Sequence, residues 1–428
     1  MSEQTVIRKP LISNIKENGA VINSPRIYFV FMLLFVLSTD SFWTYTWENR
    51  LPYNIINIAI VFMAVACAIV IFVNGKDIAV KRLAAVLTAF VGVSICMIAR
   101  TEFSLGYIHK LAYPLMGVFL SMALDLKKFA RAFVHVMMFL AVWSLVLYLL
   151  AQFKLEEYLP IVKNIGGLEL HNGIFGFIAV HGDFLVRNWG VFWEPGAFQA
   201  YLCLALIFDL FLLKDNKPIV MTVLSLTIVT TLSTTGIISL GMILLLYFIS
   251  VKDRECLLNK KVLIVAAIVV IAALLLSEKL QNMIFSKLDF DDINESSSFG
   301  ARYYSIIGNL KIAFKEGLFF GTGVENYNAI YVNTLSGMGY TKDMSNTNTI
   351  LCDLVRFGWL VGIVEILMVI KFSKKLGQNK LQRIGIALII FIILFMENFS
   401  YSLFWMSVLY FGCDVFGRGK TNENNVSV

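Results

Sequence analysis

The chain reads Arg187-Asn188-Trp189-Gly190-Val191-Phe192-Trp193-Glu194-Pro195-Gly196 at the point where a polar loop enters a long apolar run. Pro195 suits the first position of a helix, because the N–H that proline lacks would have no partner there. Glu194 would then lie at the positive end of the helix dipole. The stretch therefore predicts a membrane helix with a carboxylate and a guanidinium at its N-terminal end. Such an arrangement suits chemistry on a charged, lipid-linked substrate.

The composition is typical of a polytopic membrane protein. Of the 428 residues, 58% are hydrophobic and 15% are charged, whereas a soluble domain carries about 25% charged residues. The net charge of +7 is spread over many short loops, so it does not indicate a nucleic-acid partner. The polar segment 1–26 lacks the pattern of a cleavable signal peptide, and no cysteines show the spacing of a disulfide framework or a zinc site.

Twelve apolar stretches are candidates for membrane spans, and only helices satisfy their own backbone in lipid. We therefore predict an all-α integral membrane protein with about 12 transmembrane helices. The predicted spans are 27–47, 55–73, 83–100, 108–124, 130–151, 195–213, 219–233, 237–251, 262–277, 349–370, 384–397 and 401–416. They form one polytopic domain, 27–416, between a cytoplasmic segment, 1–26, and a cytoplasmic tail, 417–428.

The charge of the loops sets the orientation, because cytoplasmic loops carry an excess of Lys and Arg. With the N-terminus inside, most basic residues fall on the inner side. The short loops of the other side hold only Arg50, Arg100 and Lys110. The two large loops, 152–194 and 278–348, are therefore predicted to face outward, and both ends of the chain to face the cytoplasm.

Two of the predicted hairpins are too short to place their turns at the membrane surface. The stretch 219–251 would be about 50 Å long as one helix, well beyond a ~30 Å hydrocarbon core, so the chain must turn near Ser233–Gly236. The stretch 384–416 repeats the pattern around Glu397 and Asn398. Polar turns at that depth need a cavity that is filled by water or lined by protein, so we expect an outward-facing hollow.

The large loops hold most of the other polar candidates. The first contains His171, His181 and Asp183, whose spacing does not match a metal site. The second places Lys311 and Lys315 on one helical face by their i,i+4 spacing. Aromatic residues on this side could hold sugars, but they also suit the aromatic belt of the membrane interface.

Several motifs, in order along the chain, resemble the O-antigen polymerase (Wzy) family. The first is Arg187-x-x-Gly190-x-Phe192-x-Glu194-Pro195-Gly196-x-Phe198, and the second is the hairpin Leu232-Ser233-Thr234-Thr235-Gly236. The third is the series Arg302, Gly321-Thr322-Gly323 and Asn348 ahead of an apolar span that ends near Gly358. The resemblance extends from about residue 26 to 416.

The resemblance implies a metal-independent glycosyltransferase of the GT-C-like polymerase and ligase superfamily. Such an enzyme moves a growing glycan from undecaprenyl diphosphate onto the next lipid-linked repeat unit, at the periplasmic face of the bacterial inner membrane. A lipid-linked oligosaccharide as substrate, a chain-length regulator as partner and no cofactor are implied. Related ligases place a histidine where this chain has Thr347, which argues against a ligase. Some relatives carry Arg-x10-Gly signatures, from which the spacings Arg187–Gly196 and Arg302–Gly317 depart.

The proposed reaction needs cations for a diphosphate leaving group and a base for an acceptor hydroxyl. Arg187 and Arg302 are the diphosphate candidates, because a guanidinium fork matches phosphate oxygens; alternatively each braces a loop by pairing with an acid such as Glu194 or Asp289. Glu194 is the favoured base, or else a helix-end acid.

The weaker candidates are expected to contact the substrate. Arg356 lies inside a span, where an ionisable residue indicates function by default, although a pair with Asp353 would satisfy it structurally.

Two further acids, Asp209 and Glu365, lie near cytoplasmic helix ends and are expected to reach water by snorkelling. The remaining substrate-binding candidates are Lys311, His181, Glu325, Tyr340, Asn348 and Glu397.

Other functions compete with the polymerase. An O-antigen ligase, or a polymerase of the capsule or enterobacterial-antigen type, would share the architecture. A lipid-linked oligosaccharide flippase would also span the membrane many times, but it typically has repeats and short loops, neither of which this chain shows. An acyltransferase would need a histidine base near a span, and His109 and His135 have no convincing partner in the sequence.

Overall fold

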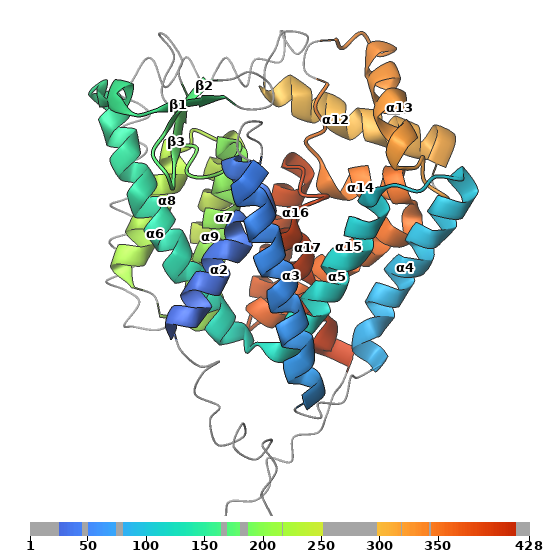
Figure 1. Cartoon of the computed structure of the whole chain (residues 1–428), viewed down its shortest axis with the longest axis horizontal. Coiled ribbons are helices and arrows are strands. Elements are labelled where there is room, and N and C mark those ends of the chain that lie inside the picture. The colour runs from blue at the N-terminus through green and yellow to red at the C-terminus, as the bar shows by residue number, and fades with distance from the viewer. Residues whose placement is uncertain are drawn as a thin grey trace, which may run out of the picture.

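The structure is a computed structural model that describes residues 25–44, 50–73, 80–163, 169–179, 187–215, 217–250, 298–317, 319–341 and 344–416. The described chain is mainly helical (Figure 1). The α-helices are α2 (Pro25–Asp40), α3 (Arg50–Val73), α4 (Val80–Arg100), α5 (Leu105–Ala123), α6 (Leu126–Gln152), α7 (Pro195–Ile207), α8 (Pro218–Thr230), α9 (Thr234–Ser250), α12 (Ser298–Ile312), α13 (Val324–Ser336), α14 (Thr349–Phe357), α15 (Trp359–Leu376), α16 (Lys380–Met396) and α17 (Leu403–Leu409). A π-helical turn extends α7 through Phe208–Leu213, and a 3-10 turn extends α17 through Tyr410–Phe416.

Helices occupy every predicted span that falls within the described ranges, while the span 262–277 lies outside them. By length and apolar composition, three helical segments of the described chain could cross a bilayer: Leu83–Arg100, Leu126–Gln152 and Pro195–Leu213. These features are consistent with a helical membrane protein, whereas the number of twelve spans stays a prediction.

The described chain is mainly helical, as predicted, and the first large loop adds a small antiparallel sheet that the sequence analysis did not predict. Its strands are β1 (Ile161–Lys163), β2 (Glu169–Asn172) and β3 (Phe177–Ala179), in the order β1-β2-β3. Phe177 packs its ring 4.2 Å from that of Phe42, and its N–H donates to the carbonyl of Gly190. Strands of three or four residues are too short to show a period of two in the sequence, although they fasten this loop to the end of α2.

The predicted span 349–370 is broken into two helices, α14 and α15, at Gly358. This glycine has a φ of +91°, and a Cβ at its position would lie 2.7 Å from the carbonyl oxygen of Phe319. The loop that contains Gly321 therefore crosses directly over the break, where only glycine leaves room. The apolar run continues through the break, so the predicted span 349–370 ran across it, although the motif series had marked an apolar span that ends near Gly358.

Replacing Gly358 by alanine should destabilise the protein, because a φ of 91° with a ψ of 170° is essentially restricted to glycine and costs another residue about 1–3 kcal/mol before the clash with Phe319 is counted. Gly241, inside α9, is the matched control, since a Cβ there meets nothing within 4 Å. We expect G358A to lower the melting temperature of the purified protein in detergent, and G241A to leave it unchanged or raise it. Equal melting temperatures would contradict the strain assigned to the break.

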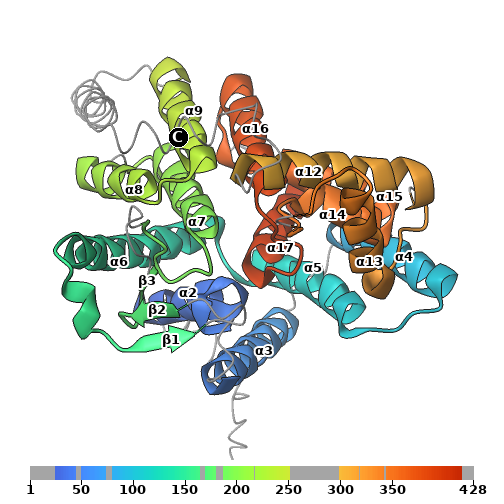
Figure 2. The same cartoon turned by 90° about the horizontal axis from the view of Figure 1, so that it is seen from above.

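The helix α7 is enclosed by other helices. Seen from above, it lies among α6, α8, α9 and α17, and α16 lies beside α9 (Figure 2). The turn after α8 and the bend after α16 both approach α7, and their polar residues Thr231, Ser233, Glu397 and Ser400 are buried. These turns are therefore lined by protein among the described residues, while their depth below the membrane surface stays a prediction.

The segments α12 and α13 form a cover at the end of the bundle that also carries the sheet (Figure 1). The first of them, α12, lies across the ends of the other helices rather than along them. Its polar face is fixed by Ser305 and Asn309, both of which hydrogen-bond to the amide oxygen of Asn346, at 2.8 and 3.2 Å. This face carries Arg302 toward α7.

Candidate active site

The loop before α7 is held against the buried turn after α8. The side-chain amide of Asn188 donates to the hydroxyls of Ser144 and Thr230, at 3.1 and 3.0 Å, and its backbone N–H donates to the carbonyl of Thr230. One residue earlier, Nε of Arg187 donates to the carbonyl of Thr231 at 3.1 Å. This hydrogen bond holds the guanidinium in place through one of its three nitrogen atoms.

The helix α7 begins at Pro195 as predicted, and Glu194 is its N-cap residue. The carboxylate of Glu194 makes no capping hydrogen bond to the helix; instead its Oε1 accepts from the indole of Trp193 at 3.2 Å. Its second neighbour is the carboxylate of Glu397. A simple helix-end role therefore does not describe Glu194, because its side chain turns away from the backbone N–H groups that it would cap.

Arg302 and Glu397 form a largely buried ion pair that joins α12 to the bend after α16. The Nη2 of Arg302 lies 3.0 Å from Oε1 of Glu397, and the two side chains are 13% and 1% exposed. The Nε of Arg302 also donates to the carbonyl of Met396 at 3.3 Å. Among the described residues, the acid paired with Arg302 is thus Glu397 rather than Glu194, while Asp289, the other acid that the sequence suggested, lies outside the described residues.

Gly196 allows Glu397 to approach the start of α7. A Cβ at Gly196 would lie 2.3 Å from Oε1 and 2.7 Å from Oε2 of Glu397. The carboxylate therefore lies against the first turn of a thirteen-residue helix, where the helix dipole stabilises a negative charge. The Glu-Pro-Gly sequence thus supplies a carboxylate, a helix start and the space for a second carboxylate.

Together, Arg187, Glu194, Arg302 and Glu397 form one cluster of two cations and two carboxylates, hereafter the charge cluster. Burial lowers the pKa of the Arg187 guanidinium, as does nearby Arg302, whereas Glu194 and Glu397 oppose that shift. The members come from the loop before α7, from α12 and from the bend after α16. Such a cluster can grip an anionic group with its guanidinium forks while a carboxylate accepts a proton.

Arg356 lies in α14 between two aromatic rings. Its guanidinium carbon is 4.4 Å from the ring centroid of Tyr327 and 5.1 Å from that of Tyr401. The side chain is buried, and its Nε and Nη1 have no hydrogen-bond partner among the described residues. Cation–π contacts of this kind stabilise a desolvated cation by about 2 kcal/mol, so the two rings replace part of the solvation free energy that the guanidinium would have in water.

The suggested structural pair of Asp353 with Arg356 is not the contact that Asp353 makes. The ammonium of Lys110, on α5, forms ion pairs with both Asp353 and Glu365, and all three side chains are buried. The expectation that Glu365 reaches water was therefore wrong, and Asp209 is buried as well, at 2% exposure. Lys110 lies 243 residues before Asp353, so sequence spacing could not reveal the triad.

Replacing Lys110 by methionine should destabilise the protein strongly, because removing one partner of a buried ion pair costs about 3–5 kcal/mol. The triple variant K110M/D353N/E365Q removes the orphaned charges, and we expect it to recover most of the loss. Thermal unfolding in detergent measures both. A K110M variant as stable as the parent would show that the triad does not hold α5, α14 and α15 together.

The remaining candidates fall in different places. Asn348 caps α14, since its Oδ1 accepts from Leu351 N–H at 2.8 Å, and its amide donates to the carbonyl of Phe395. Tyr340 is buried and stacks on Tyr304, with ring centroids 4.3 Å apart. Glu325 is exposed on α13. His181 lies outside the described residues.

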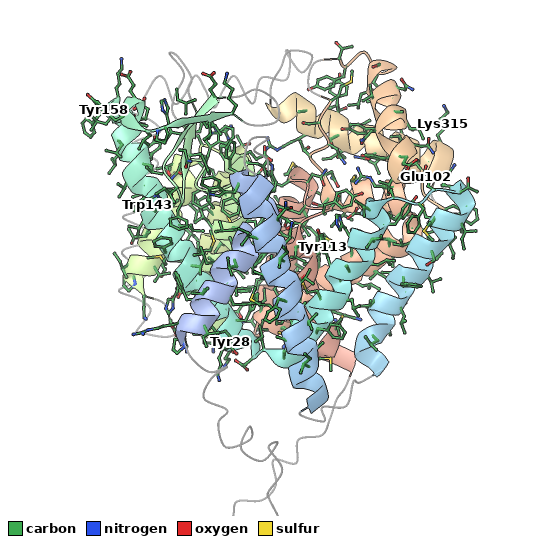
Figure 3. The ribbon with its side chains drawn as sticks, viewed as in Figure 1. Tyr28, Glu102, Tyr113, Trp143, Tyr158 and Lys315 are labelled. Carbon is green, nitrogen blue, oxygen red and sulfur yellow. The ribbon has the colours of Figure 1, made fainter. Side chains whose placement is uncertain are left out.

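Glu102 is a buried acid that the sequence did not single out. Its carboxylate accepts from the backbone N–H groups of Val324 and Glu325, at 2.9 and 3.3 Å, and from the hydroxyl of Tyr107. It therefore caps α13 from the loop between α4 and α5 (Figure 3). Gly323 makes the approach possible, because a Cβ there would lie 2.4 Å from the carboxylate; this glycine before a helix was the one signal available.

A groove of about 730 Å³ lies between α12 and α13, while an outward-facing hollow over the turns after α8 and α16 stays a prediction. Lys311 and Lys315 line the groove. Among the described residues, no three His, Cys, Asp or Glu side chains come together in a way that could hold a metal ion.

Residues 219–366 match a family model described as O-antigen ligase. The match is consistent with the O-antigen polymerase and ligase superfamily, and it confirms the resemblance. Members of this family are enzymes that act on glycans, and the match does not distinguish a polymerase from a ligase. No curated protein matches the chain. The matched segment includes Arg302, Asn348 and Arg356, whereas Arg187, Glu194 and Glu397 lie outside it.

Proposed function

We propose that the chain is a polysaccharide polymerase of the bacterial inner membrane. It transfers a growing glycan from undecaprenyl diphosphate to the next lipid-linked repeat unit, and the charge cluster faces the periplasm. The observation that carries the proposal is the convergence of Arg187, Arg302, Glu194 and Glu397 at the start of α7. Cations and carboxylates in contact are the groups that a transfer from a diphosphate to a hydroxyl requires.

In the proposed reaction, the bond between the anomeric carbon of the donor sugar and the diphosphate oxygen breaks. The acceptor hydroxyl oxygen forms the new bond to that carbon, and its proton passes to Glu194. The bond electrons leave with the diphosphate, which remains on its lipid. Arg302 and Arg187 stabilise the negative charge that develops on this leaving group, the role in which preorganised cations act most strongly.

Glu397 is assigned a positioning role. It is almost fully buried and holds the guanidinium of Arg302 by a direct ion pair, whereas Glu194 is only part-buried. A base must reach the acceptor hydroxyl within hydrogen-bond distance. The more accessible carboxylate, Glu194, therefore suits the base, and the enclosed one suits the orientation of Arg302.

The test is elongation by purified protein in liposomes, supplied with one lipid-linked repeat unit and no sugar nucleotide. The polymerase should give a ladder of longer glycans, all still on lipid diphosphate. A product that forms only after addition of lipid A-core would indicate a ligase, the alternative that the name of the matching family favours. A change of sidedness without elongation would indicate a flippase, and either result would overturn the proposal.

A further inference from the structure

The groove between α12 and α13 is separate from the charge cluster. Lys311 follows Arg302 by nine residues on α12, which places it ~14 Å farther along the helix and on the opposite side. The inner side of α12 is occupied by Arg302, Ser305 and Asn309, which contact the bend after α16, Asn346 and Tyr327. The groove therefore uses the outer side of the helix that delivers Arg302.

The lining of the groove is amphipathic and basic. Lys311 and Lys315 contribute two exposed ammonium groups, and Asn333 contributes an exposed amide. Ile307, Ile330 and Met338 line the remainder with apolar surface. No acidic side chain belongs to the described lining. A ligand that complements this surface has a compact anionic group and an apolar tail.

Exposed phenylalanine side chains lie in and beside the groove. Phe314 lines the groove and is 82% exposed, and Phe319 and Phe320, in the connection to α13, are 67% and 53% exposed. Phe319 also packs edge-on against Trp359 at the start of α15. Exposed phenylalanines next to lysines are typical of segments that lie at a membrane interface. Figure 3 places Lys315 at the same edge of the molecule as Glu102, beside the end of α4.

We propose that the groove between α12 and α13 binds the prenyl diphosphate of the acceptor, the lipid-linked repeat unit that receives the glycan. The inference rests on the proposed function, in which two lipid-linked substrates bind at once. Only the donor diphosphate is cleaved in the charge cluster. The acceptor reacts at its sugar hydroxyl, so its intact diphosphate must be held elsewhere, at a distance set by the repeat unit and at the level where its lipid enters the membrane.

The first experiment measures binding at the groove directly. Purified protein in detergent is acetylated at its lysines with and without farnesyl diphosphate, and the modification of Lys311 and Lys315 is compared with that of Lys380, an exposed lysine at the start of α16. Farnesyl diphosphate should protect the groove lysines but not Lys380. Inorganic pyrophosphate should need at least about tenfold higher concentrations, because it lacks the tail that the apolar lining contacts.

Three outcomes of this experiment overturn the inference. The first is the absence of protection at Lys311 and Lys315. The second is equal protection by inorganic pyrophosphate, which would make the groove a simple anion patch. The third is equal protection by phosphatidylglycerol, which would make it a general site for anionic lipids.

The second experiment tests whether the groove lysines affect the binding of the acceptor in the elongation reaction. In the ladder assay, the variant K311A/K315A should raise KM for the lipid-linked acceptor about tenfold, as expected for the loss of two charge contacts of modest strength. Its preference for that acceptor over a lipid-free oligosaccharide should fall by the same factor. The control R131A removes an exposed arginine of α6 that pairs with Asp215, and its kinetics should equal those of the parent.

The two proposals can fail independently. If the parent protein makes no ladder while farnesyl diphosphate still protects the groove lysines, the polymerase assignment fails and the binding site remains. If the parent protein elongates normally and K311A/K315A retains both its KM and its acceptor preference, the groove assignment fails and the polymerase remains.

Discussion

Replacing Arg302 by alanine should reduce the rate of elongation by about 10²–10³-fold, the usual effect of removing a preorganised group that stabilises developing negative charge. The side chain already points at the start of α7, held there by Glu397 and by the carbonyl of Met396. The variant R302K keeps the charge but loses the two-pronged fork that fits phosphate oxygens. We therefore expect R302K to elongate faster than R302A and slower than the parent.

The same substitution also affects stability, because it leaves the buried Glu397 without its cation. A fully buried pair broken in this way costs about 3–5 kcal/mol, and the cost is smaller here since Arg302 is 13% exposed. The double variant R302A/E397Q removes the orphaned charge, so it should melt close to the parent while remaining inactive. A double variant that is stable and forms the ladder at the parental rate would remove Arg302 from the reaction.

Local signals in the sequence predicted the elements that position the site. Proline after an acidic residue predicted the start of α7 correctly, because the preference of both residues for the first turn depends on neighbours within the same turn. The positions of the turns after α8 and α16 followed from the length of their arms, which is also a local property. The break at Gly358 was missed, since the loop that requires it, around Gly321, comes from another part of the chain.

The pairing of charges could not be predicted in this way. Arg302 and Glu397 are separated by 95 residues and Lys110 and Asp353 by 243, and a single sequence carries no record of which distant acid each cation contacts. The i,i+3 spacing placed Asp353 near Arg356 on α14, but the ion pair formed with the closer ammonium from α5. Sequence reasoning therefore identified Arg187, Glu194, Arg302 and Glu397 as candidates, while their assembly into one cluster required the tertiary fold.

Replacing Glu194 by glutamine should reduce elongation by about 10²–10⁴-fold, the usual contribution of a general base. Glutamine keeps the size of the side chain and an Oε1 that can accept from the indole of Trp193, so the variant should fold and melt like the parent. The loss should appear in kcat, because the base acts on the acceptor hydroxyl during transfer. Single-turnover rates in liposomes measure this step without product release.

Two comparisons decide whether Glu194 or its neighbour is the base. E157Q replaces an exposed carboxylate of the same large loop and should leave the rate unchanged. E397Q retains the base but weakens the hold on Arg302, so its loss should be smaller than that of E194Q and should be accompanied by weaker binding of a prenyl diphosphate. If E194Q elongates normally while E397Q is inactive, the enclosed carboxylate must receive the proton. In that case the greater exposure of Glu194 would not have identified the base correctly. The acceptor hydroxyl would then have to displace Arg302 in order to reach Glu397.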